Sequence, residues 1–385
     1  MDFGWSPDQE AYRAKVRSFL DETLPPDWWE NYAGEGPASP EVMGFAKEFL
    51  PKLGAAGYVA PHWPAAYGGA DLDAWSYTIL GEELWSNGEP RSSGYMGSNW
   101  VGPAIIEFGT EEQKQKYLGA ITRGEFLWCQ GFSEPHAGTD LLAMRTRAVR
   151  DGAGYRINGS KIWTSYAARA QICFLLARMD EEGGGKAAIT CFLMPTDTPG
   201  VEIRPIKAIH TDWDIHEIFL TDVWLPESAR LGAEGEGWGV VSSIFHHERI
   251  GAPRPALCRR VLDRIVEHLR ERGLFEQDAV RAQAANALAL VEASRQLFYL
   301  VTDGREKDRP ASTDTNIARL AIVRAEHALM DLVMAYLPDL LAEKGGDSLL
   351  RYHLHMGAAS GLGAGSAEVQ LNMIGGRRLG LPRGA

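Results

Sequence analysis

The spacing of hydrophobic residues changes twice along this 385-residue chain, and that change constrains the fold more than any other feature. Up to about residue 125, apolar residues recur at helical spacing, as at Tyr12, Val16 and Leu20. Short β-branched or aromatic runs follow, and the helical period then returns to the C-terminus. We therefore predict an α+β protein with an N-terminal helical domain over 1–125, a middle β domain over 126–230 and a C-terminal helical bundle over 231–385.

Three runs in the middle segment are typical of strands, namely residues 171–177, 188–194 and 217–225, each bounded by Gly, Pro or Asp. Residues 155–163 alternate around an Asn158-Gly159 pair, which predicts a hairpin turn at that pair. Several short strands joined by hairpins favour a small β-sandwich or barrel.

Composition limits the classes of partner. Hydrophobic content of 45% and charged content of 23% are ordinary for a globular protein, and the net charge of -12 argues against nucleic acid. No apolar run approaches the roughly 20 residues that cross a bilayer. Cys129, Cys173, Cys191 and Cys258 have neither pairing nor metal spacing, so we expect buried thiols. We expect a cytoplasmic protein without a nucleic-acid or membrane partner.

The chemistry-bearing stretch is GFSEPHAGTD at residues 131–140, followed by KIWTS at 161–165. The first piece places small residues and hydroxyls around a proline, which exposes backbone N–H groups at close range. The second offers an indole and two hydroxyls on a predicted strand. Together they suit a planar, phosphate-bearing cofactor. Spacing alone leaves the alternative that the first piece is only a turn.

Five segments carry a resemblance to one family. The two pieces above resemble the flavin-binding signature of the acyl-CoA dehydrogenases. Residues 60–69 resemble the Pro-x-x-Tyr-Gly-Gly turn of that family, residues 108–114 its Gly-Thr-Glu-Glu-Gln-Lys helix start, and residues 366–383 its C-terminal tail. The chain thus resembles the acyl-CoA dehydrogenases over nearly its whole length.

The resemblance implies FAD as cofactor and α,β-dehydrogenation of an acyl-CoA thioester, with an electron-transfer flavoprotein as acceptor. In that reaction a carboxylate removes the α proton while the β hydride passes to flavin N5. A glutamate in a dry pocket suits this role, because burial raises its pKa and makes it a stronger base.

Flavin contacts of the family carry over to positions in the loop, in the following strand and in the C-terminal segment. The matching residues are Gln130, Phe132, Ser133, Gly138, Thr139, Trp163, Ser165 and Arg272. His136 stands where the family usually has glycine, and its side chain either narrows the loop or meets a neighbouring phosphate.

The base is not at its commonest position. Many family members carry it in a Tyr-Glu-Gly-Thr motif near the C-terminus, where this chain has Ala364. A second branch carries a glutamate directly before an arginine on an earlier helix, which matches Glu248 and Arg249 here. The resemblance therefore implies Glu248 as the base and Arg249 as a substrate contact. The alternative is that these two residues form a solvated helix pair.

The C-terminal half of the flavin site is poorly matched. Of the family's Arg-x-x-Phe-Gly segment, which reaches a neighbour's pyrophosphate, only Arg272 and Phe275 remain. This asymmetry resembles a subgroup of actinobacterial steroid catabolism in which two related chains form an α2β2 heterotetramer. The resemblance thus implies a related partner chain, with a homotetramer as the alternative, and a steroid side-chain CoA as the substrate.

Two other functions stay open at this stage. An acyl-CoA oxidase or a flavin monooxygenase of the same fold would use the flavin differently. A non-catalytic scaffold subunit would only complete the flavin site of a partner; Ala364 favours it, while Ser133, Thr139, Trp163 and Glu248 oppose it.

Overall fold

The computed structural model describes residues 5–179, 185–208, 214–248, 253–307, 309, 312–342, 345–363 and 365–382, and for 246–248 only the helix that they belong to. By its internal contacts the chain divides into two compact units. The first comprises Met1–Val42, Asp71–Pro90 and Arg249–Ala385, and the second comprises Met43–Ala70 and Arg91–Glu248.

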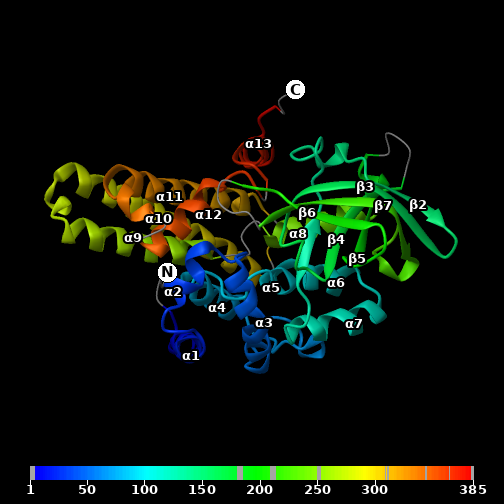
Figure 1. Ribbon diagram of the computed structural model, residues 1–385, viewed down its shortest axis with the longest axis horizontal. Helices are drawn as coiled ribbons and strands as arrows, with labels where there is room; N and C mark the ends of the chain where they lie inside the picture. The colour runs from blue at the N-terminus through cyan, green and yellow to red at the C-terminus, as the bar shows by residue number, and fades with distance from the viewer. Residues whose placement is uncertain are drawn as a thin grey trace. The chain divides into compact units, whose positions relative to one another are not determined.

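The first unit is helical. Its elements are α1 (Pro7–Thr23), α2 (Trp28–Asn31), η1 (Ala33–Glu35), α4 (Ala74–Ser86), α9 (Arg254–Glu271), η7 (Leu274–Glu276), α10 (Asp278–Glu306), α11 (Asp314–Tyr336), η8 (Pro338–Leu341), α12 (Ser348–Ala358) and α13 (Ala367–Arg378). The long helices α9, α10 and α11 pack side by side (Figure 1). Another helix, α3 (Pro40–Ala55), begins in this unit and continues into the second.

Local sequence explains the limits and the buried faces of these helices. Ser6 and Gln9 form a reciprocal capping box at the start of α1. In α9 the residues at four-residue spacing from Leu257 to Leu269 are buried, as their period predicts. The same holds for α11, where Ala318, Ile322 and Leu329 are buried. The predicted helical bundle is confirmed.

The second unit combines short helices with a sheet. Its helical elements are the rest of α3, η2 (Ala65–Tyr67), α5 (Gly94–Met96), η3 (Gly97–Val101), α6 (Gly102–Phe108), α7 (Glu111–Thr122), η4 (Leu141–Ala143), η5 (Gly185–Ala188), η6 (Glu227–Ala229) and α8 (Gly237–Glu248). Thr110 and Gln113 form the capping box of α7. Gln113 Nε2 also donates to the carbonyls of Ser228 and Arg230, at 2.9 Å each, which ties α7 to the end of the sheet.

Within the described part of the second unit, the sheet consists of the strands β1 (Trp128–Gly131), β2 (Arg147–Asp151), β3 (Gly154–Ser165), β4 (Ile172–Arg178), β5 (Ile189–Pro195), β6 (Val201–Pro205), β7 (Ile215–Pro226) and β8 (Arg230–Leu231). Their order is β6-β7-β3-β2-β4-β5-β8, with β1 beside β4. Strand β4 pairs with β1 and with β2 in parallel, and the other pairs are antiparallel.

The sheet folds over its own apolar core. The rings of Tyr155 on β3 and Phe192 on β5 lie 5.1 Å apart, although these strands are not hydrogen-bonded neighbours. Buried residues of β4 and β7, such as Leu175 and Ile218, belong to the same cluster. This layered packing agrees with the predicted β domain, so the α+β fold is confirmed.

One local prediction was wrong. The Asn158-Gly159 pair does not make a hairpin turn; it lies inside the continuous strand β3, at a register shift against β7. A Cβ atom on Gly159 would lie 2.5 Å from Thr146 Oγ1, and Gly159 has a φ of 151°. The glycine therefore serves the close approach of β2 rather than a turn. The turn between β2 and β3 contains Gly152, with φ 61°.

All four cysteines are buried free thiols, as predicted. Within the described ranges, no helix combines the length and the apolar character that a membrane span requires.

Candidate functional site

The loop that follows β1 is fastened to β3. The carbonyl of Ser133 accepts a hydrogen bond from the backbone N–H of Ile162 at 2.9 Å. Glu134 and Ala137 exchange backbone hydrogen bonds of 3.0 Å in both directions, which closes a tight turn around Pro135 and His136. Residues 133–137 after β1 are therefore held by backbone hydrogen bonds, and residues 138–140 follow this held segment.

A buried ion pair joins this turn to β3. Lys161 Nζ lies 2.8 Å from Glu134 Oε1, and the two side chains are 0% and 2% exposed. Lys161 Nζ also donates to the carbonyl of Phe132 at 3.2 Å. Glu134 accepts the backbone N–H groups of Arg145 at 2.5 Å and Thr146 at 2.9 Å. One carboxylate and one ammonium thus join the turn to β3 and to the segment entering β2.

The pair is ionised. Burial alone would raise the pKa of Glu134, but the charge of Lys161 and the hydrogen bonds from Lys161, Thr146 and Arg145 outweigh burial and lower that pKa below its ordinary value. Burial lowers the pKa of Lys161 below its ordinary value, although the charge of Glu134 partly offsets this and supports the ammonium. Because Glu134 receives three donors, the carboxylate is the form that the surroundings stabilise.

Trp163 is held in an unusual backbone conformation at the end of the same strand. Between the pairs Lys161–Ile218 and Thr164–His216 the register of β3 against β7 shifts, which marks a β-bulge. Within it Trp163 has a φ of 59°, and its side chain is 58% exposed. A bulky residue with positive φ is strained, and such strain is found preferentially at ligand sites. The bulge therefore changes the direction of the Trp163 indole from that in a regular strand, and the indole faces solvent.

The other predicted contacts of the loop lie close to this strand. Gln130 is on β1, and its buried Nε2 has no hydrogen-bond partner among the described residues. Phe132 is buried, with its ring 6.0 Å from Phe174. Ser133 and Ser165 are half-buried.

Gly138 and Thr139 are exposed at the far end of the loop. Among the described residues, no atom lies within 4 Å of where a Cβ of Gly138 would be, so the described part of the structure leaves this end of the loop open.

His136 turns back toward its own loop. Its Nε2 lies 3.5 Å from Glu134 Oε2, and its side chain is 41% exposed. The imidazole therefore adds one more contact to the carboxylate that holds the turn.

Helix α8 brings Glu248 into the same unit. Its last turn contains Phe245, whose ring lies 6.3 Å from Phe132 of the loop, and the helix ends at Glu248. Arg249 and Ala364 lie outside the described residues. The π-helical segment η3 packs against α8, and single π-turns inserted in α-helices are frequent at functional sites.

Arg272 belongs to the first unit and is engaged within the chain. It is the C-cap residue of α9, and its two Nη atoms each donate to Asp339 at 2.7 Å. Burial is small there, and the Asp339 carboxylate raises the pKa of Arg272.

Three sequence profiles match the chain in order. "Acyl-CoA dehydrogenase, N-terminal domain" matches residues 6–125, "Acyl-CoA dehydrogenase, middle domain" residues 129–223, and "Acyl-CoA dehydrogenase, C-terminal domain" residues 235–379. The chain belongs to the acyl-CoA dehydrogenase family. The resemblance drawn from the five sequence segments is therefore confirmed.

Relatives and solved structures of this family cover the whole chain. Acyl-CoA dehydrogenase IpdE1 of Mycobacterium tuberculosis is 32% identical over 386 residues, covering 98% of this chain and 99% of the relative. The structure named "Tcur3481-Tcur3483 steroid ACAD" matches with a TM-score of 0.89 at 29% identity over 100% of both chains. The ChsE4-ChsE5 complex from Mycobacterium tuberculosis matches with a TM-score of 0.87 at 28% identity, again over 100% of both chains.

Acyl-CoA dehydrogenases imply a flavin cofactor, and the loop of this member fits one. Gln130 offers a buried N–H donor without a partner among the described residues. Trp163 offers an exposed indole, and Gly138 leaves open space beside the loop. An unpaired buried donor, an aromatic face and open backbone are the groups that a planar, phosphate-bearing ligand would use.

The motif had not revealed the partnership of Lys161 and Glu134. Both residues stood in the two quoted segments, but neither was a predicted site residue. A lysine inside a strand of apolar alternation was the available signal, because a buried lysine needs a carboxylate partner. Which carboxylate serves it depends on the fold of the loop.

Proposed function

We propose that this chain catalyses the FAD-dependent α,β-dehydrogenation of an acyl-CoA thioester. The observation that carries this proposal is the loop and bulged strand of the second unit. There Nε2 of Gln130 has no hydrogen-bond partner among the described residues, and the indole of Trp163 is exposed on a strained backbone. The ion pair of Glu134 and Lys161 fixes the loop between them to β3.

The residues of the loop would hold the cofactor. In the proposal Gln130, Ser133 and Thr139 donate hydrogen bonds to it, while Phe132 and Trp163 cover its ring. Ser165, on the same strand, adds a second hydroxyl beside Trp163. When bound, FAD supplies the hydride acceptor for the β carbon of the substrate.

Glu248 is the proposed base that removes the α proton. The position of α8 supports this role, because the turn that ends at Glu248 contains Phe245, which packs on Phe132 of the loop. A carboxylate in an apolar site is a stronger base than one in water. Arg249, directly after it, is proposed to contact the acyl-CoA.

A steroid side-chain CoA ester is the proposed substrate, and a related chain the proposed partner. The likeness to a structure named as a steroid acyl-CoA dehydrogenase and to a complex of two differently named chains supports both proposals. In an α2β2 heterotetramer, Arg272 would reach the pyrophosphate of a neighbour's FAD after release from Asp339. An electron-transfer flavoprotein is the proposed acceptor, and the cytoplasm the proposed location.

The test is a comparison of this chain produced alone and produced together with a related chain. The proposal predicts bound FAD in the co-produced protein and anaerobic bleaching of its flavin absorbance by an acyl-CoA, fastest with a steroid side-chain CoA among short, long and steroidal esters. A flavin that binds but is not bleached by any ester in the series would contradict dehydrogenation. Bleaching that persists when Glu248 is replaced, but stops when a carboxylate of the partner is replaced, would instead establish the scaffold function.

A further inference from the structure

Glu134 is a junction between three segments of the second unit. Its Oε1 atom accepts from Lys161 Nζ on β3 at 2.8 Å and from the backbone N–H of Thr146 at 2.9 Å. Its Oε2 atom accepts from the backbone N–H of Arg145 at 2.5 Å and faces His136 Nε2 at 3.5 Å. The carboxylate thereby ties the turn to both the strand that carries Trp163 and the segment that enters β2.

Lys161 closes the junction from the opposite side. Its ammonium holds Glu134 and also donates to the carbonyl of Phe132 at 3.2 Å, so one group fixes two points of the turn. Ser133 lies between those points, and its carbonyl accepts a hydrogen bond from the backbone N–H of Ile162, the residue after Lys161. The conformation of residues 132–134 therefore depends on a charge that no solvent reaches.

We propose that Glu134 and Lys161 are positioning residues for the flavin, and that their charges must cancel beneath the loop for FAD to bind. Glu134 lies within the loop and Lys161 on β3, and both act through the backbone conformation of residues 132–134. FAD carries an anionic pyrophosphate, so a buried carboxylate that lost its ammonium would both release the turn and repel the cofactor. This inference rests on the proposed flavin function of the loop.

The charge requirement gives a pH signature that a purely structural contact lacks. In wild type the surroundings keep Glu134 ionised and paired, so FAD affinity should not depend on the ionisation of the pair near neutral pH. In Lys161→Met the Glu134 carboxyl keeps its burial and the backbone donors of Arg145 and Thr146 but loses its counter-charge, so its pKa rises relative to that in wild type. FAD affinity of this variant should therefore be weakest at about pH 8 and recover toward about pH 6, as the carboxyl gains a proton.

Other titratable or charged groups around the junction define the controls. His136 faces Glu134 from the same loop, and an imidazole changes its charge between about pH 5 and pH 8. Cys173 of β4 lies on the same side of the sheet near Lys161, with its Sγ 2.8 Å from where a Gly131 Cβ would be. Arg145 contributes its backbone N–H to the carboxylate. All variants are therefore compared in a His136→Gln background as well as in the native one.

The experiment is a fluorescence titration of apoprotein with FAD at about pH 6, 7 and 8, using the co-produced complex of the chain with its related partner. Lys161→Met should weaken binding by about tenfold or more at the highest pH and by less at the lowest. Lys161→Met combined with Glu134→Gln should bind with no pH dependence and tighter than Lys161→Met at the highest pH. The double variant also keeps the test valid if the single variant folds poorly.

The outcomes separate this inference from the function on which it rests. The positioning role by charge would be overturned if Lys161→Met bound FAD as tightly as wild type. It would also be overturned if Lys161→Met lost the same FAD affinity at every pH, and as much as the double variant. Wild-type complex that binds no FAD would instead overturn the proposed function, and the inference with it. Recovery with falling pH that disappears in the double variant, in both His136 backgrounds, is the expected result.

Discussion

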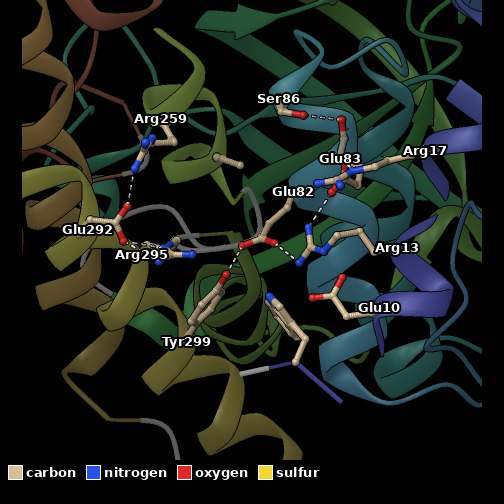
Figure 2. A pocket seen from close by; sticks show the side chains of 12 residues that line it. Glu10, Arg13, Arg17, Glu82, Glu83, Ser86, Arg259, Glu292, Arg295 and Tyr299 are labelled. Carbon is tan, nitrogen blue, oxygen red and sulfur yellow. Dashed lines mark hydrogen bonds and ion pairs between the residues drawn. The ribbon is translucent and has the colours of Figure 1, made fainter. Parts of the chain in front are cut away.

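Tyr299 donates its phenolic hydrogen to Glu82 Oε1 at 2.6 Å, across the interval between α10 and α4 (Figure 2). Arg13 of α1 holds the other oxygen of Glu82 at 2.7 Å and Glu83 Oε1 at 2.6 Å. Burial raises the pKa of Tyr299, and the neighbouring charge of Glu82 raises it further, so the phenol remains a donor. Three helices of the first unit thus meet at one buried carboxylate beside a cavity of about 450 Å³.

Replacement of Arg13 should destabilise the first unit strongly. Arg13→Met leaves the buried carboxylate of Glu82 without its cation and leaves Glu83 with Arg17 alone, which costs about 3–5 kcal/mol of unfolding free energy. The matched control is Arg17→Met, because Arg17 also pairs with Glu83 but its side chain is 60% exposed, and its loss should cost about 0–1 kcal/mol. Denaturant unfolding of both variants checks this, and equal losses would contradict the network.

Acid should weaken the protein partly through Asp347. Burial alone would raise the pKa of Asp347, but hydrogen bonds from His268 at 2.9 Å and Arg264 at 2.6 Å outweigh it and lower that pKa. A lowered native pKa gives stability that is present above the unfolded pKa of about 3.9 and is lost as pH falls through the native value.

Asp347→Asn isolates this charge, because asparagine keeps the N-cap of α12 that Asp347 provides to Leu350. Melting temperature of wild type should fall more steeply below about pH 4 than that of Asp347→Asn. Asp263→Asn, at a 61% exposed side chain, is the control and should follow wild type. Parallel acid profiles for all three proteins would exclude the assigned role of Asp347.

Helical periods and caps were predictable from sequence because they depend on residues within one turn of each other. The buried faces of α9 and α11 followed from spacing alone, and the start of α7 followed from the motif at residues 108–114. The bulges in β3 were not predictable, since they depend on its pairing with β7, which lies far away in the sequence. Gly159 illustrates this. A glycine is needed there because Thr146 approaches closely, whereas the local Asn-Gly pattern predicted a turn.

The parts of the site that are local in sequence were predicted, and the contacts between distant residues were not. The loop and Trp163 came from contiguous motifs, and the structure brings them together through Ser133 and Ile162. The Glu134–Lys161 pair joins residues 27 positions apart, so its geometry required the fold. The roles of Glu248, Arg249 and Arg272 stay predictions.

Gln130 should be required for cofactor binding but not for stability of the apoprotein. Its buried Nε2 has no partner among the described residues, so Gln130→Met removes an unsatisfied donor and should leave apoprotein stability unchanged or raise it by about 1 kcal/mol. FAD affinity should fall. Gln171→Met should instead lower the stability of the apoprotein and leave FAD affinity unchanged. Gln171 accepts from the backbone N–H of Leu127 at 2.8 Å and donates to the carbonyl of Arg169 at 3.1 Å, and the substitution removes both hydrogen bonds. Thermal unfolding and FAD titration distinguish the two variants.

Trp163 should show a similar division between stability and binding. Glycine tolerates a φ of 59°, so Trp163→Gly should relieve about 1–3 kcal/mol of backbone strain, yet it removes the indole and should weaken FAD binding. Trp224→Gly is the control, at a 42% exposed tryptophan of β7, and should lower stability without affecting FAD. A Trp163→Gly protein that binds FAD like wild type would remove Trp163 from the site.

The central claim is tested most directly at Glu248. Glu248→Gln keeps the size of the side chain and removes its basicity, while Glu276→Gln provides a control at an 89% exposed carboxylate. Each complex is loaded with FAD and mixed anaerobically with acyl-CoA, and flavin absorbance is followed over time. Glu248→Gln should bind FAD normally but not be bleached, whereas Glu276→Gln should be bleached like wild type. Bleaching of Glu248→Gln at a near wild-type rate would contradict the role of Glu248 as the base.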